Sequence, residues 1–226
     1  MKTVTLDANG KRVDQPVGTP GILMIRGPTV LPGYVTIGPD GPVLDGADKL
    51  EDGWLDTGDL ATVDADGYIS LTGRAKDLII RGGHNIDPVV VEDALLPHPR
   101  VVGVSVVGSL DPHAGEIPIA YVTLRPGDPI DPAELVAWAA EHVPERAAAP
   151  RAVVVLPALP VTEVGKPYKP ELRRDATQRA LAAALGPDVA VTARLVDGAI
   201  VVEIPAGAPA SVDFLLDRYP ITWRRR

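Results

Sequence analysis

The sequence predicts an α+β protein in which two helices cover a small mixed sheet, preceded by a stretch of short strands. Two observations predict this class. Between residues 78 and 156, apolar runs and amphipathic segments follow one another in the order β-α-β-β-α-β, which is typical of a sheet covered by helices. The 226 residues also include 24 Pro and 22 Gly, so we expect many short elements joined by turns.

The first part of the chain has the pattern of short strands. In residues 21–34, Gly27-Pro28 separates two apolar runs, and the second run ends at Pro32-Gly33. Asp66-Gly67 lies between the alternating runs 60–63 and 68–71, which predicts a hairpin. Because about sixty residues of strand and loop are marginal alone, we expect this segment to pack against something else.

Two Asp-Pro pairs mark the starts of the two helices. Asp87 and Asp131 can each accept a hydrogen bond from a free N–H group, and the Pro that follows suits the first helical position. Glu134 follows Asp131 at the spacing of a capping box. The residues expected on the apolar faces are Val91, Ala94 and Leu95 in one helix, and Leu135, Trp138, Ala139 and His142 in the other. Strands are expected at 78–81, 101–107, 117–124 and 153–156.

The last fifty residues form a third region. An Ala-rich helix is predicted over 176–185, and Asp197-Gly198 predicts a hairpin between strands at 189–195 and 199–204. A last helix is expected over 211–219. The closing arginines 224–226 are interpreted as a solvated basic end, in preference to an anion-binding site.

Composition excludes several classes of protein. The net charge of −8 argues against a nucleic-acid coat or a binder of anionic membranes. The absence of cysteine excludes a disulfide scaffold, a thiolate nucleophile and a Cys-ligated zinc site. No apolar run approaches the roughly 18 residues of a membrane helix, and the first ten residues do not resemble a signal peptide. We therefore expect a soluble cytoplasmic chain without a transmembrane segment.

Three short segments could carry chemistry, and each has a plainer alternative. In Thr57-Gly58-Asp59, a carboxylate beside a glycine could accept hydrogen bonds from the two hydroxyls of a ribose. The alternative is that Asp59 caps a turn. Arg74, Lys76 and Arg81 stand close to Gly82-Gly83, which suggests an anion-facing hinge at a domain boundary, or else a charged hairpin exposed to water.

The third segment is the Pro-bounded loop 160–169, in which Lys166 follows Gly165. A lysine there could bring an ammonium to a developing negative charge, or it could be an ordinary surface lysine. The segment lacks the spacing of a phosphate-binding P-loop. The chain's histidines, at 84, 98, 113 and 142, show no metal-ligand spacing, so no metal site is predicted and structural roles are expected.

In their order and spacing, these segments resemble a known family. DGWLDTGDL, DADGYISLTGRAKDLIIRGGHNIDPVVVEDALLPHPRV and LPVTEVGKPYKPELR are similar to the last third of the adenylate-forming acyl-CoA synthetases, most closely the bacterial fatty-acyl-CoA ligases. The resemblance runs from about Gly18 to about Arg174. It implies a ligase that makes an acyl-adenylate and pyrophosphate from a carboxylic acid and ATP. Coenzyme A then displaces AMP to give the thioester.

The resemblance also implies roles for particular residues. Asp59 would bind the ribose hydroxyls of ATP or AMP, with Arg74 also reaching the nucleotide. Lys76 would be the hinge, and Lys166 the catalytic lysine of adenylation. Gly82 and Gly83 would border the coenzyme A tunnel. Mg²⁺ would accompany ATP, although no ligand for it can be identified in this chain.

On this resemblance, residues 1–74 are the β-rich end of a large N-terminal domain, 75–175 a mobile C-terminal lid, and 176–226 an extension of unknown role. The phosphate loop and acyl pocket of the family lie outside the sequence, so the isolated chain is expected to be inactive. Its partners would be the large domain and a carboxylic acid of the fatty-acid class, but no nucleic acid. One alternative is a stand-alone, non-catalytic lid-like module that binds a separate large domain. A weaker one is the tail of a peptide-synthetase adenylation domain, because no Ser-centred carrier motif follows Lys166.

Overall fold

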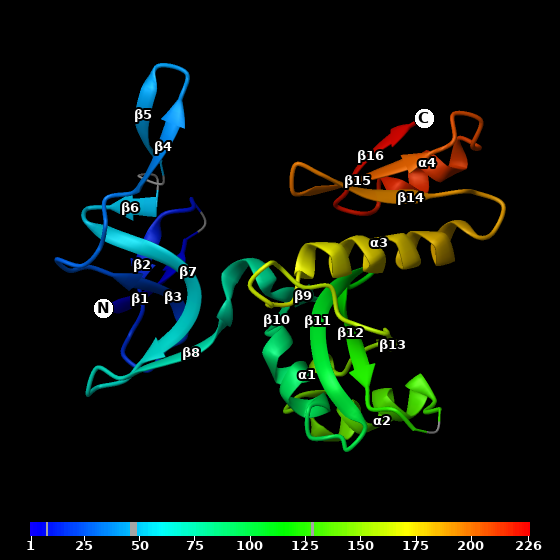
Figure 1. Ribbon diagram of the computed structural model, residues 1–226, viewed down its shortest axis with the longest axis horizontal. Coiled ribbons are helices and arrows are strands. Elements are labelled where there is room, and N and C mark those ends of the chain that lie inside the picture. The colour runs from blue at the N-terminus through cyan, green and yellow to red at the C-terminus, as the bar shows by residue number, and fades with distance from the viewer. Residues whose placement is uncertain (8, 46–48, 128) are drawn as a thin grey trace. The chain divides into compact units, whose positions relative to one another are not determined.

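The computed structural model describes residues 1–7, 9–45, 49–127 and 129–226 (Figure 1). The chain divides into two compact units, Met1–Asp77 and Leu78–Arg226. No helix in the described ranges is long and apolar enough to cross a membrane.

The first unit is built on an antiparallel sheet. Its strand order is β2-β1-β3-β7-β6, with β8 also paired to β7. The strands are β1 (Lys2–Leu6), β2 (Arg12–Asp14), β3 (Gly21–Ile25), β6 (Leu50–Glu51), β7 (Trp54–Val63) and β8 (Ile69–Arg74). The small core contains Val4, Leu23, Met24 and Ala61. A separate hairpin joins β4 (Tyr34–Gly38) and β5 (Gly41–Asp45).

The predictions for this unit are confirmed in part. The hairpin at Asp66-Gly67 is present, because β7 and β8 pair antiparallel around it. The second apolar run of 21–34 is not a strand: β3 ends at Ile25, and a turn closed by the Val30 N–H to the Gly27 carbonyl follows. Pro28 and Pro32 cannot donate to a strand ladder, which explains the break.

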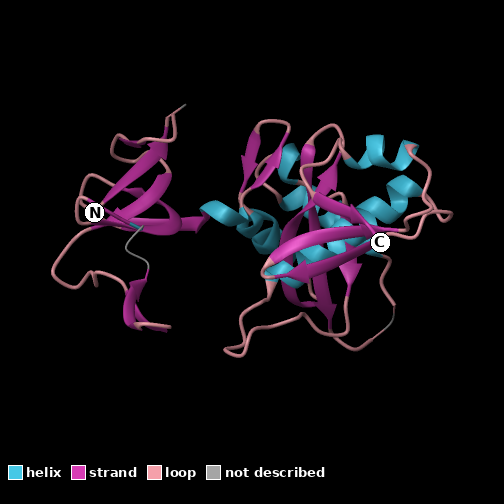
Figure 2. Cartoon of the chain, turned by 90° about the horizontal axis from the view of Figure 1, so that it is seen from above, coloured by secondary structure: helices cyan, strands magenta, loops and turns pink. Residues whose placement is uncertain are grey.

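The second unit contains the predicted mixed sheet. Its order is β10-β9-β12-β11, and β13 pairs parallel to β12 while the other pairs are antiparallel. The strands are β9 (Ile79–Arg81), β10 (His84–Ile86), β11 (Val101–Asp111), β12 (Gly115–Leu124) and β13 (Ala152–Val155). All α-helices of the described chain lie in this unit (Figure 2).

Both Asp-Pro predictions are confirmed. Helix α1 (Pro88–Leu95) is capped by Asp87, whose side chain accepts from the Val89 N–H at 2.9 Å. Helix α2 (Pro132–His142) is capped in the same way by Asp131, which accepts from Ala133 at 2.9 Å. The two helices bury one face of the sheet, with Val91, Leu95, Val106, Ala120, Val122, Leu135 and Ala139 in a shared core.

A third helix covers the opposite face of the sheet, as Figure 1 shows. Helix α3 (Lys169–Leu185) begins earlier than the predicted residue 176 and packs on β11. Successive residues of a strand face opposite sides. Val107, Ile119 and Tyr121 therefore point away from α1 and α2, and they form a second core with Leu172 and Ala176 of α3.

The last residues form a small layer against α3. β14 (Thr192–Val196) and β15 (Ala199–Ile204) make the predicted hairpin, and β16 (Thr222–Arg225) pairs parallel to β15. Helix α4 is shorter than expected and spans Ser211–Leu216. Leu181 of α3 joins the core of this layer. The boundary proposed between 175 and 176 thus falls inside α3, while the compact units divide at Asp77/Leu78.

The expectation of a solvated basic end is confirmed in part, because Arg224 and Arg226 are exposed but the segment is an ordered strand. Arg224 and Arg225 belong to β16, and the Arg226 N–H continues the ladder by donating to the Ile204 carbonyl at 2.8 Å. The three side chains form ion pairs with Glu203 or Asp213. Pairing with β15 holds this end in place, which the sequence pattern did not indicate.

Candidate active-site residues

Asp59 and Arg74 lie next to each other on adjacent strands of the first unit's sheet. They are direct partners in the pairing of β7 with β8, and Arg74 Nε lies 2.9 Å from Asp59 Oδ1. The Asp59 side chain is 27% exposed and that of Arg74 is 56% exposed. Asp59 lies inside β7, so the alternative in which it caps a turn is wrong. Register thus brings together two residues that the sequence placed fifteen positions apart.

The backbone before Asp59 is held by two hydrogen bonds of the Thr57 hydroxyl. Thr57 Oγ1 donates to the Leu23 carbonyl at 2.9 Å and accepts from the Asp59 N–H at 3.1 Å. Gly58 adopts a φ of +69°, a conformation that L side chains rarely take. The sequence Thr-Gly-Asp therefore forms an irregular point of β7 directly before the Asp59 side chain.

Asp56 is a neighbouring charge that the sequence reasoning missed. Its Oδ2 lies 2.8 Å from Arg12 Nη2, and Arg12 Nη1 lies 2.6 Å from Glu51 Oε2. The hydrogen bond that Arg12 donates to Glu51, followed by the one it donates to Asp56, raises the pKa of Arg12. Two isolated carboxylates in a sequence give no sign that one distant arginine will bridge them.

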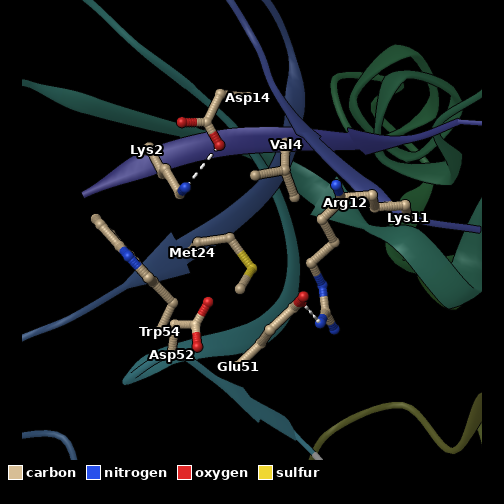
Figure 3. A pocket seen from close by; sticks show the side chains of 9 residues that line it. All are labelled: Lys2, Val4, Lys11, Arg12, Asp14, Met24, Glu51, Asp52 and Trp54. Carbon is tan, nitrogen blue, oxygen red and sulfur yellow. Dashed lines mark hydrogen bonds and ion pairs between the residues drawn. The ribbon is translucent and has the colours of Figure 1, made fainter.

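Arg12 also lines a cavity of about 240 Å³ in the first unit (Figure 3). Figure 3 shows Lys2 directed to Asp14 and Arg12 directed to Glu51 around this hollow. Trp54 forms part of its wall, and the Lys2 ammonium lies 4.7 Å from the centre of the Trp54 ring. Asp59 and Arg74 do not line it, so this cavity is distinct from the predicted nucleotide-binding residues.

The predicted hinge and glycine pair lie on either side of the division between the units. Lys76 is an exposed residue of the short 3₁₀ helix η2 (Ala75–Asp77), the last element of the first unit. Gly82 and Gly83 form the turn between β9 and β10, with φ of +56° and +88°. Neither glycine has an atom within 4 Å of the position that a Cβ would take, so the turn is open on that side.

Arg81 is structural in this unit and not anion-facing. Its guanidinium donates to the carbonyls of Ala147 and Ala149, at 2.6 and 3.3 Å. These contacts tie β9 to the 3₁₀ helix η3 (Arg146–Ala148). Of the three cations around the predicted hinge, Arg81 is therefore committed to the fold.

Lys166 is exposed on a tight hairpin. The bridge between Val161 and Pro167 closes the hairpin, and the Thr162 N–H donates to the Lys166 carbonyl at 2.8 Å. Gly165 has a φ of +78°, which completes the turn. No hydrogen bond or ion pair joins the Lys166 ammonium to another residue within the described ranges. The backbone is thus ordered while the charged group stays accessible.

An ion pair that the sequence did not suggest anchors the end of this hairpin. Lys169 Nζ lies 3.0 Å from Glu92 Oε1, and both side chains are only 19% exposed. Glu92 Oε1 also accepts from the Val106 N–H at 2.8 Å. Through Glu92, the residue that starts α3 is connected to α1 and to β11.

Two of the histidines pack against the ring of Trp138. Buried His98 meets the edge of Trp138 with centroids 4.9 Å apart, and His142 stacks on the same ring at 4.2 Å. Among the residues that the structure describes, no three His, Asp or Glu side chains gather in a way that could hold a metal ion.

Comparisons with known proteins agree with this architecture. Residues 90–166 match the AMP-binding enzyme C-terminal domain. The marinolic acid–CoA ligase of a Pseudoalteromonas species is 42% identical over 79% of this chain and 27% of the ligase. A medium/long-chain-fatty-acid–CoA ligase of Mycobacterium tuberculosis is 39% identical over 76% of this chain and 30% of that enzyme.

A solved structure is similar as well. The o-succinylbenzoate CoA synthetase of Bacillus subtilis, in complex with its acyl-adenylate intermediate, is 30% identical with a TM-score of 0.62. The match covers 75% of this chain and 33% of that one.

The mixed sheet with its exposed lysine hairpin therefore contains the region that matches the AMP-binding enzyme C-terminal domain. The chain thus contains a region that matches this domain family, and the similar sequences include acyl-CoA ligases. It spans less than a third of the length of those two ligases.

Proposed function

We propose that the chain forms the C-terminal part of an ATP-dependent acyl-CoA ligase. Such an enzyme converts a carboxylic acid, ATP and coenzyme A into acyl-CoA, AMP and pyrophosphate. The observation that carries the proposal is the accessible ammonium of Lys166, held on an ordered hairpin at the end of the matched domain. The similarity to two CoA ligases supports the reaction class.

Adenylation needs a cation because two anionic groups must meet. The carboxylate of the acid attacks the α-phosphorus of ATP, the acyl–phosphate bond forms, and pyrophosphate leaves with the electrons of the broken P–O bond. We infer that Lys166 places its ammonium between the carboxylate and phosphate oxygens. A preorganised donor of this kind typically contributes on the order of 10²–10³ in rate, about 3–4 kcal/mol.

The nucleotide would meet Asp59 and Arg74. Asp59 Oδ1 is engaged by Arg74, while no hydrogen bond to Oδ2 is found among the described residues. We infer that the free oxygen accepts from a ribose hydroxyl, with Arg74 holding the carboxylate in place. The structure of the Bacillus subtilis relative contains an acyl-adenylate, which is the class of intermediate that the proposal requires.

The second half-reaction uses other residues. In the proposed cycle the units rotate about Lys76, and Lys166 leaves when the thioester is made. Gly82 and Gly83 would then border the path of the coenzyme A thiol, where absent side chains leave room. Mg²⁺ would enter with ATP, and the acid would be a fatty or related carboxylic acid. The cytoplasmic location stays a prediction from the sequence.

The test separates the two half-reactions in an enzyme that contains this chain together with its large domain. Lys166→Ala should slow acyl-adenylate formation about 10²–10³-fold and largely spare thioester formation from a supplied adenylate. Glu163→Gln, in the same hairpin, is the matched control and should change neither. Equal loss of both half-reactions in Lys166→Ala would refute the role of the lysine.

A second measurement tests whether the chain supplies only part of the active site. The 226-residue chain alone should show no ATP–pyrophosphate exchange, because the proposed phosphate loop and acyl pocket belong to the large domain. Measurable exchange by the isolated chain would contradict the proposal that it supplies only part of the active site.

A further inference from the structure

Three arginines surround one buried carboxylate on the outer face of the last sheet. Glu203, on the central strand β15, is paired in register with Arg224 of β16. Arg194 on β14 and Arg226 lie on the same face, since residues two apart along a strand point to one side. The opposite face, with Val202 and Ile204, belongs to the apolar core.

Glu203 organises these side chains. Its side chain is 8% exposed, and it accepts from Nε of Arg194 at 3.0 Å and from Nε of Arg224 at 3.1 Å. Arg226 Nη1 lies 3.5 Å from the same carboxylate. The hydrogen bond from Arg224, more than that from Arg194, lowers the pKa of Glu203. The carboxylate therefore stays ionised and holds three like charges close together.

The cluster keeps an excess of two positive charges, because one carboxylate faces three guanidinium groups. Each guanidinium has five N–H donors, and most of these donors have no partner in the described part of the chain. The arginine side chains are 51–68% exposed. Together with Arg225, they line a hollow of about 460 Å³.

We propose that Arg194, Arg224 and Arg226 bind a phosphomonoester group carried by a small molecule. A phosphomonoester is a dianion near neutral pH and matches the excess charge, whereas one carboxylate would neutralise only half of it. Planar guanidinium groups also present paired donors that fit phosphate oxygens. The chain as a whole carries a net charge of −8, which disfavours long polyanions and favours a small ligand.

The site is independent of the proposed ligase chemistry. It lies beyond residues 90–166, the part that matches the AMP-binding enzyme C-terminal domain. Lys166, Asp59 and Arg74 do not line its hollow. Loss of binding here would therefore leave the roles proposed for those residues untouched.

The experiment titrates the full 226-residue chain with inorganic phosphate and follows the Nε–H signals of the arginines by NMR. Sodium chloride at equal ionic strength controls for screening. We expect saturable shifts for Arg194 and Arg224. Arg224→Gln and Arg194→Gln should each raise the dissociation constant about tenfold or more, the effect of losing one charge-assisted hydrogen bond. Arg218→Gln, an exposed arginine outside the cluster, should change nothing.

The source of the phosphate is separated by a pair of ligands. Coenzyme A has a phosphomonoester that dephospho-coenzyme A lacks. Tighter binding of coenzyme A, with the difference abolished by Arg224→Gln, supports an organic phosphate as ligand. Equal binding of the pair, with saturable binding of phosphate, would contradict an organic carrier and assign the site to the free phosphate ion.

Three results would overturn the proposal. The first is no saturable response to phosphate or to coenzyme A at the arginine signals. The second is binding that survives both Arg→Gln variants, each shown to be folded by an unchanged thermal midpoint. The third is a response to an oligoglutamate peptide but not to phosphate, which would assign the cluster to an acidic protein partner.

Discussion

The ion pair between Glu92 and Lys169 should stabilise the second unit at the end of the lysine hairpin. The Glu92 carboxylate receives two charge-assisted hydrogen bonds, one from Lys169 at 3.0 Å and one from the Val106 N–H at 2.8 Å. Glu92→Ala removes both bonds, whereas Lys169→Ala removes only the first. Glu92→Ala should therefore destabilise the second unit more than Lys169→Ala does.

The magnitude follows from these two contacts. A hydrogen bond to a charged group contributes about 1.5–3 kcal/mol, and the 19% exposure of both side chains lets water screen part of it. We expect Glu92→Ala to cost about 3 kcal/mol in the free energy of unfolding and Lys169→Ala about 1.5 kcal/mol. In the double variant, a coupling energy of about 1–2 kcal/mol should appear.

Urea unfolding followed by far-ultraviolet circular dichroism is a suitable assay, because all α-helices of the described chain lie in the second unit. Asp93→Ala, an exposed neighbour on α1, is the matched control and should stay within about 0.5 kcal/mol of the parent. Strictly additive single effects, with no coupling energy, would refute the claim that the pair stabilises this unit.

Two further predictions concern the loops of this unit. Hydrogen bonds from the backbone N–H of Ala114, and then of His113, lower the pKa of Asp111 below its ordinary 3.8. The ionised Asp111 carboxylate therefore stabilises the fold above pH 3.8. This stabilisation is lost as the pH falls through the lowered pKa. Urea unfolding at a series of acidic pH values should show this loss in the parent but not in Asp111→Asn, and identical profiles would contradict it. Gly165→Ala should strain the hairpin by about 1–2 kcal/mol, because φ there is +78°, which L side chains disfavour. The added Cβ would meet no atom within 4 Å, so no steric clash adds to this cost. Faster hydrogen exchange of the position-165 amide would report it, and unchanged exchange would count against it.

Local signals predicted the central elements well. The two Asp-Pro pairs placed α1 and α2 because capping depends on residues within one turn of the helix start. Asp66-Gly67 and Asp197-Gly198 placed two hairpins for the same reason, since a tight turn is decided by its own residues.

The start of α3 was missed because its first turns are strongly charged. Residues 169–175 include Lys169, Glu171 and Asp175, and they do not suggest a helix that covers a sheet. In the fold, Asp175 accepts from the hydroxyl of buried Tyr121 at 2.9 Å, a partner 54 positions away. Burial and this bond raise the pKa of Tyr121. No local pattern encodes a contact of that range.

The sequence by itself determined which chemical groups are present: the Asp59 carboxylate, the Arg74 guanidinium and a lysine after a turn glycine. Motif order then indicated the acyl-CoA synthetase family. Tertiary structure alone decided that β7–β8 register pairs Asp59 with Arg74, and that Glu203 gathers three arginines. Residue types and turns are local properties, but strand register and ion pairs depend on segments that meet only after the chain has folded.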